Sequence, residues 1–258
     1  MVAAHRASRG TPARGGATIG GVLTTDAPDL WQRIFGEAWE PPATMVLVTA
    51  GVALLVVLVR PVWVVARNVI TIVHEAGHGL VALLAGRRLS GIRLHSDTSG
   101  VTVSRGRPEG PGMVLTALAG YVAPSLLGLA FAALLAGERT SAVLVICAIL
   151  LFGVLVMVRN AYGVLSVVVT GLLLFAVSWF APAEVRAAFA YFIAWFLLVG
   201  GLRPVVELQR KRARGRAGDS DADQLARLTG APGFFWVGSF ALIDLGALAL
   251  GCAWLLLP

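Results

Sequence analysis

The sequence predicts an all-α membrane protein, a polytopic bundle of about six to seven transmembrane helices with one short β-hairpin. Of its 258 residues, 57% are hydrophobic and only 14% are charged, whereas soluble domains carry about 25% charged residues. The mean hydropathy is +0.81. Apolar stretches recur along the chain at lengths near the roughly 20 residues that a helix needs to cross a bilayer.

Seven candidate spans account for these stretches and form one membrane domain over residues 42–258. The first span ends at Arg60-Pro61. Only Arg159-Asn160 separates the fourth span from the fifth, so these two are either separate spans or one broken helix. The seven spans cover residues 43–60, 61–85, 112–136, 140–158, 161–181, 184–202 and 233–257.

The charges of the loops predict an orientation. The loop over residues 86–111 carries five arginines, and the loop over 203–232 carries seven basic residues. Basic loops stay in the cytoplasm, and seven spans place both loops on the same side as the N-terminus. We therefore expect a cytoplasmic N-terminus, with residues 1–41 as a flexible leader that is rich in Gly, Ala, Thr and Arg.

The overall charge and the cysteines narrow the partners and the metal chemistry. The net charge is +7, which in a membrane protein favours contact with the lipid bilayer and its headgroups over nucleic acid. Both cysteines, Cys147 and Cys252, lie in apolar stretches. The sequence therefore predicts neither a disulfide framework nor a cysteine-rich zinc site.

The second candidate span contains the pattern H-E-x-x-H, formed by His74, Glu75 and His78. Residues four apart lie on one face of a helix, so both imidazoles can reach the same metal ion. Glu75 lies close enough to that ion to take a proton from a metal-bound water. Ionisable groups are costly at membrane depth and normally face a partner or a watery cavity. The pattern therefore predicts a metal site inside the membrane.

A β-hairpin is predicted directly after this span, within residues 89–105. Ile92 and Leu94, and later Val101 and Val103, alternate with polar residues on either side of a polar turn. Two interpretations stay open. The hairpin either offers its edge to an extended peptide beside the metal site or is an ordinary surface hairpin.

Five stretches together resemble the site-2-protease family of intramembrane zinc metalloproteases, in its branch of short bacterial and plant relatives. H-E-x-x-H is the most specific feature. The element S-D-A, formed by Ser220, Asp221 and Ala222, supports the resemblance. The stretches are HEAGHGLVALLAGRRL (74–89), SGVT (99–102), AGYVAPSLLG (119–128), RNAYG (159–163) and SDADQLARLTGAPGFFW (220–236).

The resemblance implies a metalloendopeptidase of a bacterial cell membrane that hydrolyses peptide bonds of membrane-anchored protein substrates. It implies Zn²⁺ as the cofactor, His74 and His78 as zinc ligands and Glu75 as the general base. Better-studied members take the third zinc ligand from the Asp of an L-D-G pattern on a later span, and this sequence has no L-D-G.

Four residues are candidates for the third ligand. Asp221 comes first, because its S-D-A element recurs in this branch. Asn160 lies where the missing pattern is expected in chain order, Asp244 is an acid inside the last span, and His95 lies in the hairpin. Each also has an ordinary explanation, as a helix cap, a paired polar group or a solvated charge.

Two other functions stay open at this point. Metal transporters also place His and acidic residues at mid-depth in a membrane. The absence of L-D-G also suits a catalytically inactive relative that acts as an assembly factor. No feature of the sequence indicates an oligomeric state.

Overall fold

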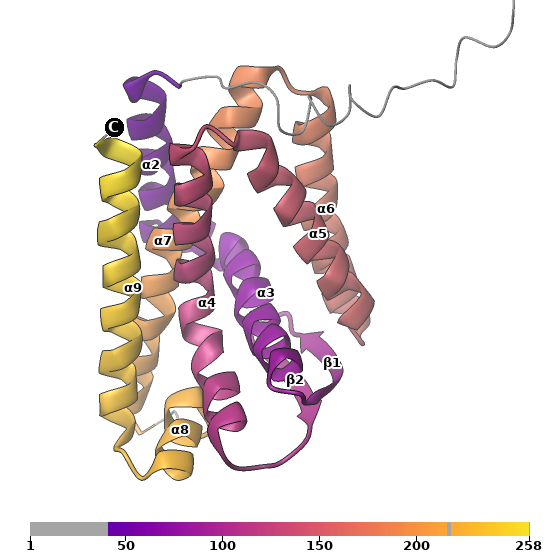
Figure 1. Cartoon of the computed structure of the whole chain (residues 1–258), viewed down its shortest axis with the longest axis vertical. Helices are drawn as coiled ribbons and strands as arrows, with labels where there is room; N and C mark the ends of the chain where they lie inside the picture. Colours follow the sequence, from indigo (N-terminus) through magenta and orange to yellow (C-terminus); the bar gives the residue numbers. More distant parts are fainter. Residues whose placement is uncertain (1–40, 216–217, 258) are drawn as a thin grey trace, which may run out of the picture.

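The structure is a computed structural model that describes residues 41–215 and 218–257. The predicted leader falls, except for residue 41, outside the described residues. The elements in chain order are α2 (Ala43–Leu58), α3 (Arg60–Leu84), β1 (Arg88–Leu94), β2 (Gly100–Arg105), α4 (Pro111–Ala136), α5 (Thr140–Met157), α6 (Ala161–Phe180), α7 (Ala183–Ala213), α8 (Asp221–Thr229) and α9 (Gly233–Leu256). Figure 1 shows a helix bundle with one small hairpin. The predicted fold class is confirmed.

The helices α4, α5, α6, α7 and α9 are each long and apolar enough to cross a membrane. The pair α2 and α3, bent by 102° at its junction, is together apolar enough to form one further, broken crossing, which makes up to six. The bend falls at Val59, which is extended, and Pro61 follows in the first turn of α3, where its missing backbone N–H has no helical partner to lose. The sequence analysis took this break for the end of a complete span. The described helices therefore offer up to six crossings, one fewer than the seven separate spans expected.

The even number of crossings changes the predicted orientation. The hairpin and α8, which belong to the two basic loops, lie at one end of the bundle. The first residue of α2 and the last residue of α9 lie at the other end. The two basic loops share one side, as expected, but the start of α2 is on the opposite side. The predicted cytoplasmic N-terminus rested on an odd number of crossings and no longer follows.

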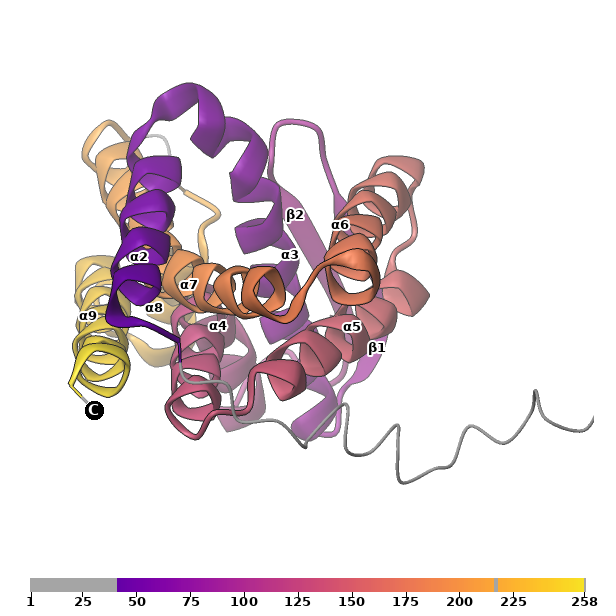
Figure 2. The same ribbon diagram turned by 90° about the horizontal axis from the view of Figure 1, so that it is seen from above.

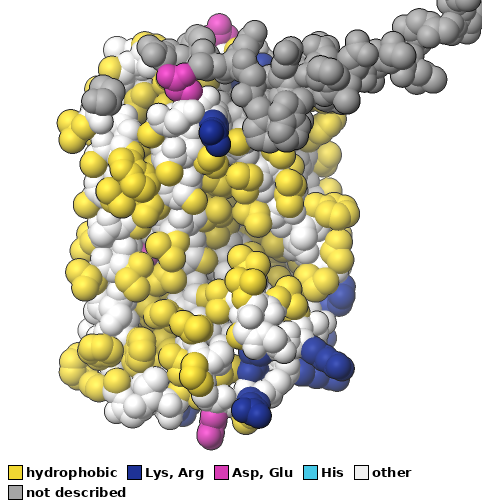
Figure 3. Space-filling view, viewed as in Figure 1, with side chains coloured by type: hydrophobic (Ala, Val, Ile, Leu, Met, Phe, Trp, Pro, Cys, Tyr) yellow, Lys and Arg dark blue, Asp and Glu magenta, His cyan; other side chains and the backbone are white. Residues whose placement is uncertain are grey.

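The surface of the bundle agrees with a membrane location. In Figure 3, apolar side chains cover the flank of the molecule, and the charged side chains gather toward its two ends. The helices α5 and α6 are two separate helices, each long enough to span, and they lie together on one side of the bundle in Figure 2. The fourth and fifth candidate spans are therefore separate helices, and not one broken helix.

The predicted hairpin is present, and it packs against α3. The two strands pair antiparallel, with Ile92 opposite Thr102. Asn160, just before α6, holds β1 in place, because its amide oxygen accepts from the backbone N–H of Leu94 at 3.1 Å and its amide nitrogen donates to the Leu94 carbonyl at 2.6 Å. Next to it, Val158 forms a single parallel bridge with Ile92. The hairpin is thus anchored to two helices at the basic end of the bundle.

Candidate metal centre

The helix α3 supplies two imidazoles to one point. His74 and His78 are separated by one helical turn, and their Nε2 atoms are 3.1 Å apart. The His78 side chain is almost fully buried, whereas that of His74 is partly exposed. The His74 ring also packs edge-on against the ring of Tyr121 from α4, with centroids 4.9 Å apart. Both rings are therefore held in place by packing.

The helix α4 fixes the tautomer of His78 and leaves space for both rings. Nδ1 of His78 lies 2.7 Å from the Thr116 carbonyl oxygen, and a carbonyl only accepts, so Nδ1 carries the proton. Nε2 then points its lone pair at His74, the arrangement that metal-binding histidines use. Gly120 faces the two rings, and a Cβ atom at this position would lie 2.7 Å from Cε1 of His74. Only glycine leaves the imidazoles this room.

The third group at this point comes from α8, about 140 residues later in the chain. Ser220 is the N-cap of α8, and its hydroxyl accepts from the backbone N–H of Asp223. Asp221 is therefore not needed as the cap, and its side chain is free to turn toward α3. Its Oδ2 atom lies 3.3 Å from Nε2 of His74 and 3.3 Å from Nε2 of His78.

These three atoms form a triangle with sides of 3.1, 3.3 and 3.3 Å. Three ligands at about 2.1 Å from a tetrahedral zinc ion would be separated by about 3.4 Å. The residues present thus fit a zinc ion in their spacing and in their donor atoms. Among the described residues, His74, His78 and Asp221 form the one group of three or more His, Cys, Asp or Glu side chains with metal-ligand spacing.

The charge at the centre suits a cation. Burial of the Asp221 carboxyl opposes its ionisation, but the two neighbouring imidazoles outweigh that effect, so the pKa of Asp221 lies well below its usual range. The carboxylate is therefore ionised at neutral pH. The Nε2 atoms of both imidazoles and one negatively charged carboxylate oxygen converge on a space that a metal ion can fill.

Glu75 lies beside this triangle and faces the hairpin. Its side chain is buried, and its Oε2 atom accepts a hydrogen bond of 2.6 Å from the Thr102 hydroxyl of β2. Gly100 of β2 is also close, since a Cβ atom there would lie 2.6 Å from Oε1 of Glu75. The hairpin thus supplies both the space and a donor that hold this carboxylate in one orientation.

The structure does not bring the other three third-ligand candidates to the histidines. The side-chain amide oxygen and nitrogen of Asn160 both form hydrogen bonds with the backbone of Leu94. Asp244 is fully buried in α9, and neither of its carboxylate oxygens has a partner among the described residues. His95 is exposed at the hairpin turn, where its Nδ1 lies 3.4 Å from the Ser99 hydroxyl. None of these three belongs to the group formed by the histidines and Asp221.

Thr102, Thr116 and Gly120 also belong to the centre, and none of them was among the predicted catalytic or metal-ligating residues. Thr102 and Gly120 fall inside stretches that carried the family resemblance, but no spacing rule links a strand threonine or a helix glycine to a metal site. A polar cavity of about 330 Å³ adjoins the centre and is lined in part by Tyr121 and Ser220.

One comparison with known proteins gives a match. The family model described as Peptidase M50B-like matches residues 47–251, which include the whole bundle from α2 to α9 apart from its outermost turns. The chain belongs to this family of peptidases. It is an integral membrane protein by its family and by its apolar helices. No curated protein and no solved structure matches the chain.

Proposed function

We propose that this protein is a zinc-dependent intramembrane endopeptidase that cleaves membrane-anchored protein substrates. His74, His78 and Asp221 are the proposed zinc ligands, and Glu75 is the proposed general base. The observation that carries the proposal is the triangle of Nε2, Nε2 and Oδ2 atoms with sides of 3.1 to 3.3 Å. Three protein ligands with one open position are typical of catalytic zinc, whereas structural zinc sites are closed.

The residues around the triangle divide the chemistry among them. Zinc, when bound, polarises the scissile carbonyl and makes a bound water acidic enough to react at neutral pH. Glu75 accepts the proton of the attacking water at its carboxylate and later delivers it to the leaving amine. The hydrogen bond from Thr102 keeps that carboxylate in place. The Thr116 carbonyl keeps the Nε2 lone pair of His78 directed at the centre.

The hairpin is the proposed place for the scissile segment. Strand β2 pairs only with β1 among the described residues, so one of its edges is open. Thr102 on this strand touches Glu75, and an extended segment added to the open edge would pass close to the general base. Exposed Val101 and Val103 offer apolar contacts on the outer face of the strand. A membrane helix must unwind locally to be cleaved, and an open strand edge binds an unwound backbone.

The test uses the full-length protein purified in detergent, with bound zinc and cleavage of a helical model substrate measured on the same samples. We expect Glu75→Gln to keep zinc and lose cleavage, and His74→Ala to lose both. His95→Ala is the matched control, because it removes a histidine away from the centre and should leave both unchanged. A metal transporter would instead show zinc flux that survives Glu75→Gln, and an inactive relative would show no cleavage in the wild-type protein.

A further inference from the structure

A second polar site lies apart from the metal centre, between the start of α3 and the end of α7. It is a cavity of about 400 Å³, called here the basic pocket. Six of its lining side chains are cationic, and one, Glu207, is acidic. The cations are Arg60, Arg67, Arg203, Arg210, Lys211 and Arg214. The proposed peptidase chemistry uses none of these side chains.

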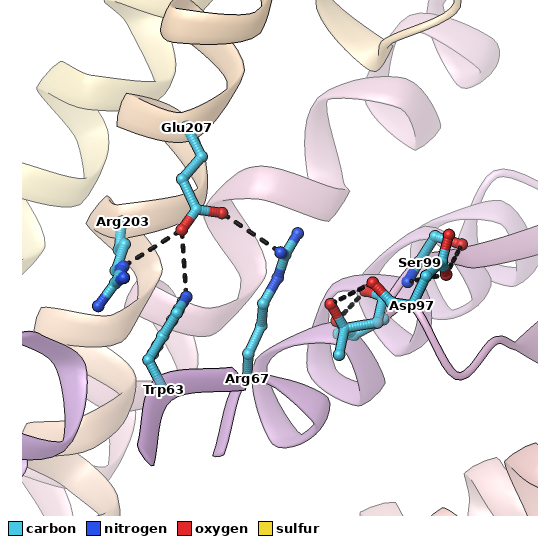
Figure 4. A network of polar contacts seen from close by, with 8 residues as sticks. Trp63, Arg67, Asp97, Ser99, Arg203 and Glu207 are labelled. Atoms are coloured by element: carbon cyan, nitrogen blue, oxygen red, sulfur yellow. Dashed lines mark hydrogen bonds and ion pairs between the residues drawn. The ribbon is translucent and has the colours of Figure 1, made fainter. Parts of the chain in front are cut away.

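The floor of the basic pocket is a fixed polar network (Figure 4). The Glu207 carboxylate lies 3.2 Å from Nε of Arg203 and 3.4 Å from a terminal nitrogen of Arg67. The buried Trp63 donates its indole N–H to the same carboxylate at 3.1 Å. The Arg203 guanidinium also lies over the Trp63 ring, 4.7 Å from its centroid. The network holds two arginines in place with one carboxylate, so the floor keeps a positive charge.

The rim of the pocket adds four more cations that have no acidic partner among the described residues. These are the exposed side chains of Arg60 on α3 and of Arg210, Lys211 and Arg214 at the end of α7. The lining therefore carries five positive charges in excess. Surface arginines of a membrane protein normally spread along the interface, whereas these converge on one cavity. Their mutual repulsion is relieved when an anion binds between them.

The surroundings of the pocket identify the kind of anion. Exposed apolar side chains accompany the cations on both helices: Val64 of α3 lines the pocket itself, and Val206 of α7 lies one turn from both Arg203 and Arg210. A soluble anion gains nothing from these side chains, but a lipid has acyl chains to lay against them. Basic pockets between transmembrane helices on the cytoplasmic side are known to suit anionic lipid headgroups. Arginine suits the phosphate itself, because its planar fork can donate two hydrogen bonds.

We propose that the basic pocket binds the phosphate of an anionic phospholipid headgroup, with the acyl chains against the exposed apolar side chains of Val64 and Val206. The rim cations hold the phosphate, and the floor network keeps Arg67 and Arg203 directed at it. This site is independent of the proposed peptidase function, because its rim residues do not contact the histidines or Asp221. Failure of either proposal leaves the other standing.

The test is a lipid titration of the detergent-purified full-length protein, followed by native mass spectrometry. The lipids are phosphatidylglycerol and phosphatidylcholine. The pocket variant is Arg60→Gln/Arg210→Gln/Arg214→Gln. The matched control is Arg88→Gln/Arg93→Gln/Arg105→Gln, which removes the same charge from exposed hairpin positions. We expect phosphatidylglycerol to bind the wild-type protein at least tenfold more tightly than phosphatidylcholine, and this preference to fall about tenfold or more in the pocket variant only.

Three results would overturn the proposal. Equal losses in the pocket and hairpin variants would mean diffuse attraction by net charge. Equal binding of the two lipids would mean no headgroup recognition. Displacement of phosphatidylglycerol by millimolar inorganic phosphate would mean a site for a soluble anion. Zinc content and circular dichroism check that each variant is folded. If the triple variant does not fold, Arg210→Gln/Arg214→Gln provides the test, since both positions are exposed in the last turn of α7 or directly after it.

Discussion

Gly120→Ala is the substitution that most directly tests the metal centre. Gly120 lies on α4 and contacts no metal itself, yet an added methyl group would lie 2.5 Å from Cε1 of His78 and 2.7 Å from Cε1 of His74. The methyl group is small, apolar and favourable for a helix. Any loss of zinc must therefore come from displacement of the two imidazoles, and not from removal of a ligand or from a weaker helix.

The size of the effect follows from these distances. Ordinary contact begins near 3.4 Å, so the rings would have to retreat by roughly 0.8 Å. Zinc–ligand distances tolerate only about 0.2 Å of change, so at least one imidazole would leave the metal. Even substitutions that only disturb the orientation of a ligand cost about 10- to 100-fold in metal affinity. We expect Gly120→Ala to weaken zinc binding by at least 100-fold, or about 3 kcal/mol.

The assay is competition for zinc between the purified protein and a chromophoric chelator. Gly128→Ala, on the same helix as Gly120, is the matched control. Its methyl group would also be crowded, by the backbone nitrogen of Leu198 on α7 at 2.9 Å, but by no imidazole. We expect this control to bind zinc normally once it is folded. Stoichiometric zinc and an affinity within threefold of wild type in Gly120→Ala would refute the assigned geometry. An equal loss in both variants would refute it too, since general loosening would then explain the result.

Three further predictions concern the hairpin. Thr102→Val removes the hydroxyl that donates a hydrogen bond to Glu75. The rate of cleavage should fall about 10- to 100-fold, and the amount of bound zinc should not change. Cleavage at the wild-type rate would argue against Thr102 as a positioning residue. Asn160→Ala should leave zinc bound but speed hydrogen exchange of β1, and unchanged exchange would contradict the clamp. Hydrogen bonds from the Ser99 hydroxyl and backbone N–H lower the pKa of the Asp97 carboxyl below 3.8. The ionised carboxylate therefore stabilises the turn at neutral pH. This stabilisation is lost as the pH falls through the lowered pKa. The Ser99 amide signal should titrate in NMR below pH 3.8 in the wild type and not in Asp97→Asn.

The chemistry of the centre was accessible from the sequence because one helix carries most of it. His74, Glu75 and His78 are fixed relative to one another by helix geometry alone. The hairpin was accessible for a similar reason, since its alternation and its polar turn are local patterns. Asp221 could be ranked first only through the family resemblance. Nothing local in its stretch distinguishes a metal ligand from the first acid of a capped helix.

The rest depends on contacts between distant segments. Gly120 and Thr102 belong to the metal centre because α4 and β2 pass within a few ångströms of the H-E-x-x-H residues. The local sequence around either residue does not reveal that contact. The number of crossings was overestimated for a related reason. Arg60-Pro61 marks an interruption of helical hydrogen bonding, but whether the chain then turns back or continues across the membrane depends on packing. Here α2 packs along α7 and α3 packs along α4, and α2 and α3 together are apolar enough to form one broken crossing.

The position of the proposed third ligand, Asp221, has a physical consequence for how the centre assembles. The histidines belong to a 25-residue helix, whereas Asp221 belongs to a nine-residue helix that would be unstable alone. This short helix is held by the Ser220 cap and by buried Ala222 and Leu225. Without a metal ion, only hydrogen bonds between the Asp221 carboxylate and the two imidazoles join α8 to α3 at this point. A bound metal would therefore stabilise the docking of α8 far more than the fold of α3, so that closing of the catalytic centre and binding of zinc become one event.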